Sequence, residues 1–113
     1  MQFYEVEDLT IEILQEVSGK YLLPYQVFKR IKQRDPSLGQ IIENSYPALP
    51  GNPIVGDGAG INYSPVTFIG RALDGFRKKY PEIDKQWFDA TDLEIEGIIP
   101  GNKISTSIWS WRF

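Results

Sequence analysis

The chain has 113 residues, 42% of them hydrophobic, with three Trp, six Tyr, six Phe and a formal net charge of −3. This length fits one domain, residues 1–113, and the apolar content excludes a disordered chain. Cys and His are absent, which excludes disulfides, thiolate chemistry and catalysis or metal binding by imidazole. With no signal-peptide pattern and no apolar run near the roughly 18 residues of a membrane helix, we expect a cytoplasmic protein without membrane contact.

The charges change sign along the chain. Acidic residues gather in residues 1–19, basic residues in 20–34, and a second basic group lies in 64–80. Such a mildly acidic chain is not a general polyanion binder, but it has the means to present one basic face.

Two helices are expected in the first third of the chain. The first covers residues 9–18, where apolar residues recur at helical spacing and Gly19 follows; a short strand at 3–6 precedes it. The second runs over 24–34, because Pro24 suits a first helical turn and Pro36 disfavours helix before it.

A short third helix is expected at 37–43, with Leu38, Ile41 and Ile42 facing inward. A long Pro/Gly-rich loop then covers about 44–63. Its Gly-rich part, 51–60, has only a superficial likeness to a phosphate-binding loop, because it lacks the terminal Gly-Lys-Ser/Thr and contains Asp57. We interpret it as a surface loop.

The clearest helix is expected at 64–80. Ser64 is a good cap and Pro65 suits the first position. Its apolar stripe should bury Leu73 and Phe76 against the C-terminal elements. Pro81 ends it, and a short turn of helix through Trp87 is expected to follow.

The C-terminal third favours a β-hairpin. Polar and apolar residues alternate over 92–99, Pro100-Gly101 is typical of a turn, and 103–112 is rich in strand-forming residues. An even loop places Ile104 and Ile108 on the face of the apolar residues of 92–99. The predicted class is therefore α+β, with three to four helices followed by a C-terminal hairpin.

No catalytic, cofactor or metal site is predicted, and we expect no enzyme activity. Asp92, Glu94 and Glu96 alternate and share one strand face, which suits Mg²⁺ in principle. A solvated strand face that protects a sheet edge explains the same acids without a ligand.

Three aromatic residues near the C-terminus, Trp109, Trp111 and Phe113, alternate and project to one side of a strand. Either the same chain covers this side, or it is an interface, since Trp is enriched where binding energy concentrates. The first function hypothesis is a non-enzymatic interaction module whose partner is another protein or a second copy of the chain.

The second hypothesis is a DNA-binding regulator that uses the basic helices 24–34 and 64–80. A helix followed by a hairpin is similar to the end of a winged helix, where the last helix enters the major groove. The candidate nucleic-acid contacts are Lys29, Arg30, Arg71, Arg77 and Lys78. Two features oppose it: Asp74 lies in the middle of the later helix, and about thirty residues separate the helices instead of a tight turn. Only a long insertion reconciles the sequence with that fold.

Overall fold

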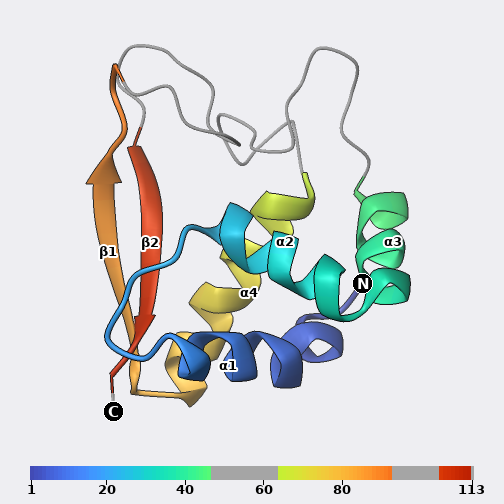
Figure 1. Ribbon diagram of the computed structural model, residues 1–113, viewed down its shortest axis with the longest axis horizontal. Coiled ribbons are helices and arrows are strands. Elements are labelled where there is room, and N and C mark those ends of the chain that lie inside the picture. Colours follow the sequence, from blue (N-terminus) through green and yellow to red (C-terminus); the bar gives the residue numbers. More distant parts are fainter. Residues whose placement is uncertain (47–63, 93–104, 113) are drawn as a thin grey trace.

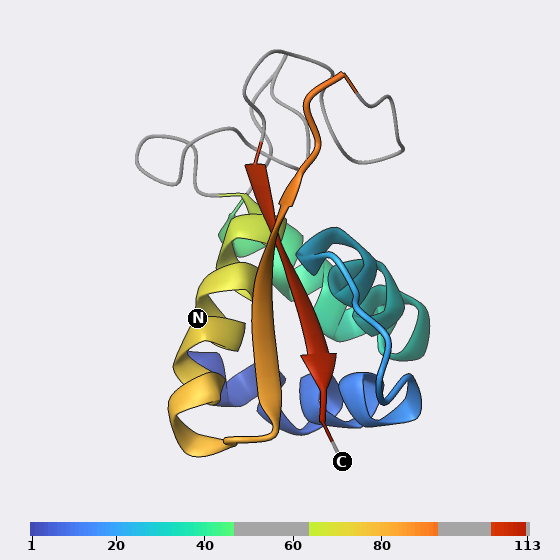
Figure 2. The ribbon, with the colours of Figure 1, turned by 90° about the vertical axis from the view of Figure 1, so that its left-hand side faces the viewer.

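The computed structural model describes residues 1–46, 64–92 and 105–112. In chain order its elements are a 3₁₀ helix η1 (Phe3–Val6), α1 (Glu7–Glu16), α2 (Pro24–Arg34), α3 (Pro36–Ser45), α4 (Pro65–Lys79), β1 (Ile83–Asp89) and β2 (Ser105–Trp111). The helices pack together, and the two strands lie across one side of them (Figures 1 and 2). Four α-helices followed by an antiparallel hairpin confirm the predicted α+β class.

Strand β2 is paired along both edges. On one edge it runs antiparallel to β1, with a register from Ile83 opposite Trp111 to Asp89 opposite Ser105. On the other edge the backbone of Leu22 donates to the Trp109 carbonyl over 2.7 Å and accepts from the Trp109 N–H over 2.8 Å. The segment between α1 and α2 therefore covers the edge of β2 that faces away from β1 (Figure 2), which satisfies backbone groups that would otherwise be exposed.

Helix α4 supplies the centre of the core. Its inner face buries Ile69 and Leu73 completely and leaves Phe76 only 4% exposed, so the predicted burial of Leu73 and Phe76 is confirmed. The Ser64 hydroxyl caps the helix by accepting a hydrogen bond from the Thr67 N–H over 3.1 Å. The helix predicted at 64–80 is correct to within its capping residues, and the one predicted at 24–34 has the predicted ends.

At the N-terminus, the predicted strand was wrong and the predicted helix is confirmed with its ends shifted by two residues. The expected strand at 3–6 is a 3₁₀ helix, because the Glu5 carboxylate accepts from the Gln2 N–H over 2.6 Å and so curls the backbone locally. Helix α1 begins at Glu7 and ends at Glu16 instead of covering 9–18. Gly19 takes a positive φ of 83° beyond the helix end, where its N–H donates to the Trp111 carbonyl.

Helix α3 is longer than predicted, because the Asp35 carboxylate accepts from the Leu38 N–H over 3.0 Å and starts it at Pro36. Of the residues expected to face inward, Ile42 is fully buried and Leu38 is partly buried, but Ile41 is 50% exposed. The inward prediction was therefore wrong for Ile41.

The largest correction concerns the residues after α4. The predicted turn of helix through Trp87 is instead strand β1, Ile83–Asp89. Lys85 lies between Ile83 and Trp87 on the same strand face and interrupts the apolar alternation that marks a half-buried strand. The strand predicted at 103–112 is confirmed as β2, but its predicted pairing with 92–99 was wrong, because β2 pairs with Ile83–Asp89. Residues 93–104, with the predicted turn, lie outside the described residues, as does the loop from residue 47 to 63.

Candidate nucleic-acid interface

A groove of about 350 Å³ lies between the first turns of α4 and the hairpin. Thr67, Gly70 and Arg71 line it from α4, Lys85 and Trp87 from β1, and Ser105 and Ser107 from β2. The strand geometry explains how β1 contributes, because Ile83, Lys85 and Trp87 alternate onto one face. That face starts in the core, where Ile83 is 2% exposed, and leaves it at Trp87, which is 67% exposed.

Lys85 lies at the boundary between the groove and the core. Its ammonium nitrogen lies 4.6 Å from the ring centroid of Trp87 and 5.2 Å from that of Trp109, both within the range of a cation–π contact. The Lys85 side chain is only 15% exposed, since its aliphatic stem packs while its charged end stays at the groove. A lysine therefore occupies an inward strand position that an apolar residue would normally fill.

The negative charge of Asp74 opposes the contact of α4 with DNA phosphates. In the structure, two cations compensate this charge. Oδ1 of Asp74 lies 3.2 Å from Nη2 of Arg77 and 3.3 Å from Nζ of Lys85. The cluster of these three side chains carries a net positive charge, and the exposed Arg71 lies one turn nearer the start of α4. The outer face of α4 is therefore cationic despite Asp74.

Three of the predicted contacts, Arg71, Arg77 and Lys78, are exposed on α4. The two on α2 do not join them at the groove. Lys29 lines a separate hollow of about 310 Å³ on α2 and its ammonium lies 5.8 Å from the ring centroid of Tyr25. Arg30 is half-buried on the same helix. The two basic segments thus do not merge into one described site.

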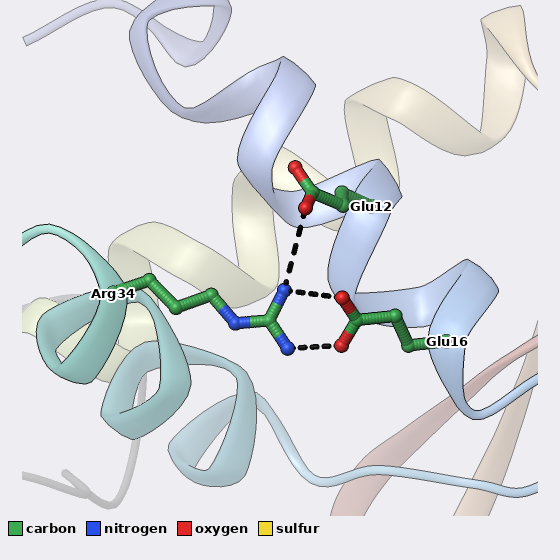
Figure 3. A network of polar contacts seen from close by, with 3 residues as sticks. All are labelled: Glu12, Glu16 and Arg34. Atoms are coloured by element: carbon green, nitrogen blue, oxygen red, sulfur yellow. Dashed lines mark hydrogen bonds and ion pairs between the residues drawn. The ribbon is translucent and has the colours of Figure 1, made fainter.

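Other basic residues of α2 are engaged within the fold. Arg34 forms a fork with Glu16 of α1, with Nη1 2.7 Å from Oε1, and lies 3.7 Å from Glu12 (Figure 3). Lys32 pairs with Glu43 of α3 over 2.6 Å. The hydrogen bond from Arg34 holds the pKa of Glu16 below its ordinary value. These cations therefore connect helices.

Acids near the hairpin have their own partners. Asp84 points to the sheet face opposite Lys85 by strand alternation, and its carboxylate accepts from the Tyr21 hydroxyl. This bond lowers the pKa of Asp84 and raises that of Tyr21. Asp89, at the end of β1, accepts from the Thr91 N–H over 2.9 Å. By alternation, Asp89 is on the same face of β1 as Lys85 and Trp87. It is the last residue of the strand and lies opposite Ser105 of β2.

The aromatic residues proposed as a partner interface differ in how deeply the structure buries them. Trp109 is 1% exposed within the core, and its indole N–H donates to the Ser107 hydroxyl over 2.9 Å. Trp111 is half-buried, with its ring centroid 6.0 Å from that of Tyr80, and Phe113 lies outside the described residues. The same chain therefore covers Trp109; a partner at Trp111 and Phe113 stays a prediction.

Sequence reasoning missed Lys85 and Trp87 because it placed them in a helical turn. The alternation of Ile83, Lys85 and Trp87, with the lysine counted as an apolar stem, was the signal for a strand. Within residues 1–46, 64–92 and 105–112, no group of three or more acidic, Cys or His residues is arranged to hold a metal. Glu94, Glu96 and the Gly-rich segment 51–60 lie outside these residues.

Comparison with models of known protein families, with curated proteins and with solved structures found no match. In the part of the chain that the structure describes, no helix is both long and apolar enough to cross a membrane.

Proposed function

We propose that the chain is a DNA-binding module that presents α4 and the hairpin to the DNA backbone. The observation that carries the proposal is the pairing of Asp74 with both Arg77 and Lys85. It turns the outer face of α4 into a surface of excess positive charge beside the hydroxyl-lined groove. Cationic side chains, hydroxyl groups and helix starts are the groups that commonly contact DNA phosphates.

The distribution of the acids supports the proposal despite the net charge of −3. The acidic helix α1 lies at the opposite end of the molecule from the start of α4 (Figure 1). Several of its carboxylates are occupied: Glu16 by Arg34, and Glu7 by Lys79 over 2.7 Å and by the Tyr80 hydroxyl over 2.8 Å. Long-range repulsion of DNA by these groups is weakened, since charges more than about 8 Å apart are screened at physiological salt.

The element order also supports it. A helix that packs in the core and is followed by a two-stranded hairpin has the element order found at the end of a winged helix. On this proposal, the insertion that a winged helix would require consists of α3 and residues 47–63, which separate α2 from α4 in the sequence. Fold analogy alone does not establish function, so the proposal depends on the charges of α4.

The proposal is tested by salt titration of a fluorescently labelled, mixed-sequence duplex. Binding should weaken steeply with salt, because each phosphate contact releases counterions and adds about 0.9 to the slope of log K against log salt. The variant R71Q/R77Q/K78Q should bind more weakly and lose roughly one unit of slope for each contact removed.

Circular dichroism of the variant should match the parent, because all three side chains are exposed. A slope unchanged by the triple substitution would remove α4 from the interface. If the parent fails to bind duplex even at low salt, the protein-interaction hypothesis takes its place.

A further inference from the structure

We infer that the groove beside α4 takes an unpaired nucleobase, so that the module prefers DNA in which a duplex ends in a single strand. The inference rests on the proposed function and deepens it. It starts from Trp87, whose side chain is the most exposed Trp among the described residues, at 67%. A solvated indole at a groove wall is costly to leave uncovered and is a ready stacking surface.

The chemistry around Trp87 is that of a nucleotide site. The indole supplies a flat π face, and Lys85 supplies a cation 4.6 Å from its ring centroid. Arg71 adds a second cation on the facing wall, while Ser105 and Ser107 add hydroxyl groups. An aromatic plane for a base and cations for its phosphate, side by side, are the two parts of single-strand recognition.

The size and the charge agree with such a ligand. A volume of about 350 Å³ falls at the lower end of the roughly 300–1,000 Å³ typical of ligand pockets. Among the described residues that line the groove, Asp74 is the one carboxylate, and Lys85 and Arg77 balance it. The described part of the wall therefore offers a phosphate more cations than acids. An acidic ligand is favoured over a cationic peptide.

The base must be unpaired for a geometric reason. Within a duplex both faces of a base are covered by its neighbours, so a Trp face is accessible only to a base at an end, in an overhang or flipped out. With the outer face of α4 on the duplex backbone, Trp87 on the adjoining hairpin reaches the first base beyond the paired region.

The experiment compares three labelled DNAs that share one sequence: a blunt duplex, the same duplex with a short single-stranded overhang, and the single strand alone. The parent protein should bind the overhang duplex about tenfold more tightly than the blunt duplex, since stacking of one base contributes on the order of tenfold or more. Intrinsic Trp fluorescence should be quenched by the overhang DNA and much less by the blunt duplex.

The decisive variants are Trp87→Ala, Trp87→Phe and the matched control Phe88→Ala, whose side chain is 37% exposed on the opposite face of β1. W87A should bind both duplexes with the blunt-duplex affinity and lose the quenching, W87F should keep part of the preference, and F88A should behave as the parent. If W87A keeps the overhang preference, or the parent shows none while binding blunt duplex, the inference is overturned and the proposed function stands. If no DNA binds, both fail together.

Discussion

The chain contains two basic helices, and the structure uses them in different ways. On α2, Arg34 is held by Glu16 and Glu12 of α1, and Lys32 by Glu43 of α3. On α4, the single carboxylate Asp74 is shared by Arg77 and Lys85, which leaves an excess of positive charge at the groove. Charge counts alone do not distinguish the helices; the partners that the fold brings to each of them do.

This difference separates a stabilising function from a binding function. Cations that connect helices lose freedom to engage an external anion, because their carboxylate partners must first be released. Cations that outnumber the acids around them retain attraction for phosphate. We therefore place the proposed DNA-contacting surface on α4 and the hairpin, and assign Arg34 and Lys32 of α2 to stabilising the helix packing.

The largest expected effect is on the free energy of unfolding. It compares a core residue, Trp109, with a groove residue, Trp87, on the same face of the hairpin. Trp109 is 1% exposed and Trp87 is 67% exposed. Trp109→Ala should lower the free energy of unfolding by about 3–5 kcal/mol, through lost burial and a cavity. Trp87→Ala should change it by no more than about 0.5 kcal/mol, as for most surface substitutions. Urea denaturation followed by circular dichroism measures both, and comparable losses would show that Trp87 belongs to the core and not to the groove.

An intermediate effect is expected at the start of α4, which forms one wall of the groove. The hydroxyl of Ser64 caps the helix and also lies 3.0 Å from that of Thr67. Ser64→Ala should lower the free energy of unfolding by about 1 kcal/mol. Ser45→Ala, at the exposed end of α3, is the matched control and should cost less than about 0.5 kcal/mol. Equal losses would mean that the cap does not position the start of α4.

The smallest expected effect concerns the ion pairs of Arg34 on α2 with Glu16 and Glu12 on α1. Arg34→Gln should lower the melting temperature slightly at neutral pH, because exposed ion pairs contribute little. The pKa of Glu16 is lowered in the folded protein by its hydrogen bond from Arg34. The stability from this pair is complete above the ordinary glutamate pKa of about 4.3, and is lost as pH falls through the lowered value.

The difference in melting temperature between the parent and R34Q should therefore shrink from pH 7 to pH 3. Both proteins will lose stability in acid, since the pKa values of Glu7 and Asp84 are also lowered in the fold. The informative quantity is the gap between them. A gap that stays constant or widens in acid would show that Arg34 does not act through the carboxylate of Glu16.

Local signals in the sequence were sufficient for α2, α4 and β2. Proline at a first helical position and a capping serine are short-range features, so the start of α4 followed from Ser64 and Pro65 and its end from Pro81. Strand β1 was not predictable in this way, because its inward face contains Lys85, whose ammonium reaches the Trp109 ring only after β1 pairs with β2. The pattern that marks a strand was broken by a residue whose role depends on tertiary contacts.

The candidate site shows the same limit. Arg71 and Arg77 were predicted from their place on the outer side of a helix, where periodicity is informative. The neutralisation of Asp74 by Lys85 was not, since it joins residues on α4 and β1 through the packing of the hairpin. Trp87 was not predicted as a site residue, because its strand was interpreted as a helical turn. In the sequence, Asp74 opposed DNA binding by α4. In the structure, Lys85 of β1 pairs with this carboxylate.

The most direct test of the account is the salt dependence of duplex binding in two matched triple variants. R71Q/R77Q/K78Q on α4 and R30Q/K32Q/R34Q on α2 lower the net charge by the same amount, so long-range attraction changes equally in both. The account predicts that the α4 variant flattens the slope of log K against log salt by roughly two to three units, while the α2 variant stays within about half a unit of the parent. A larger loss of slope in the α2 variant than in the α4 variant would contradict it.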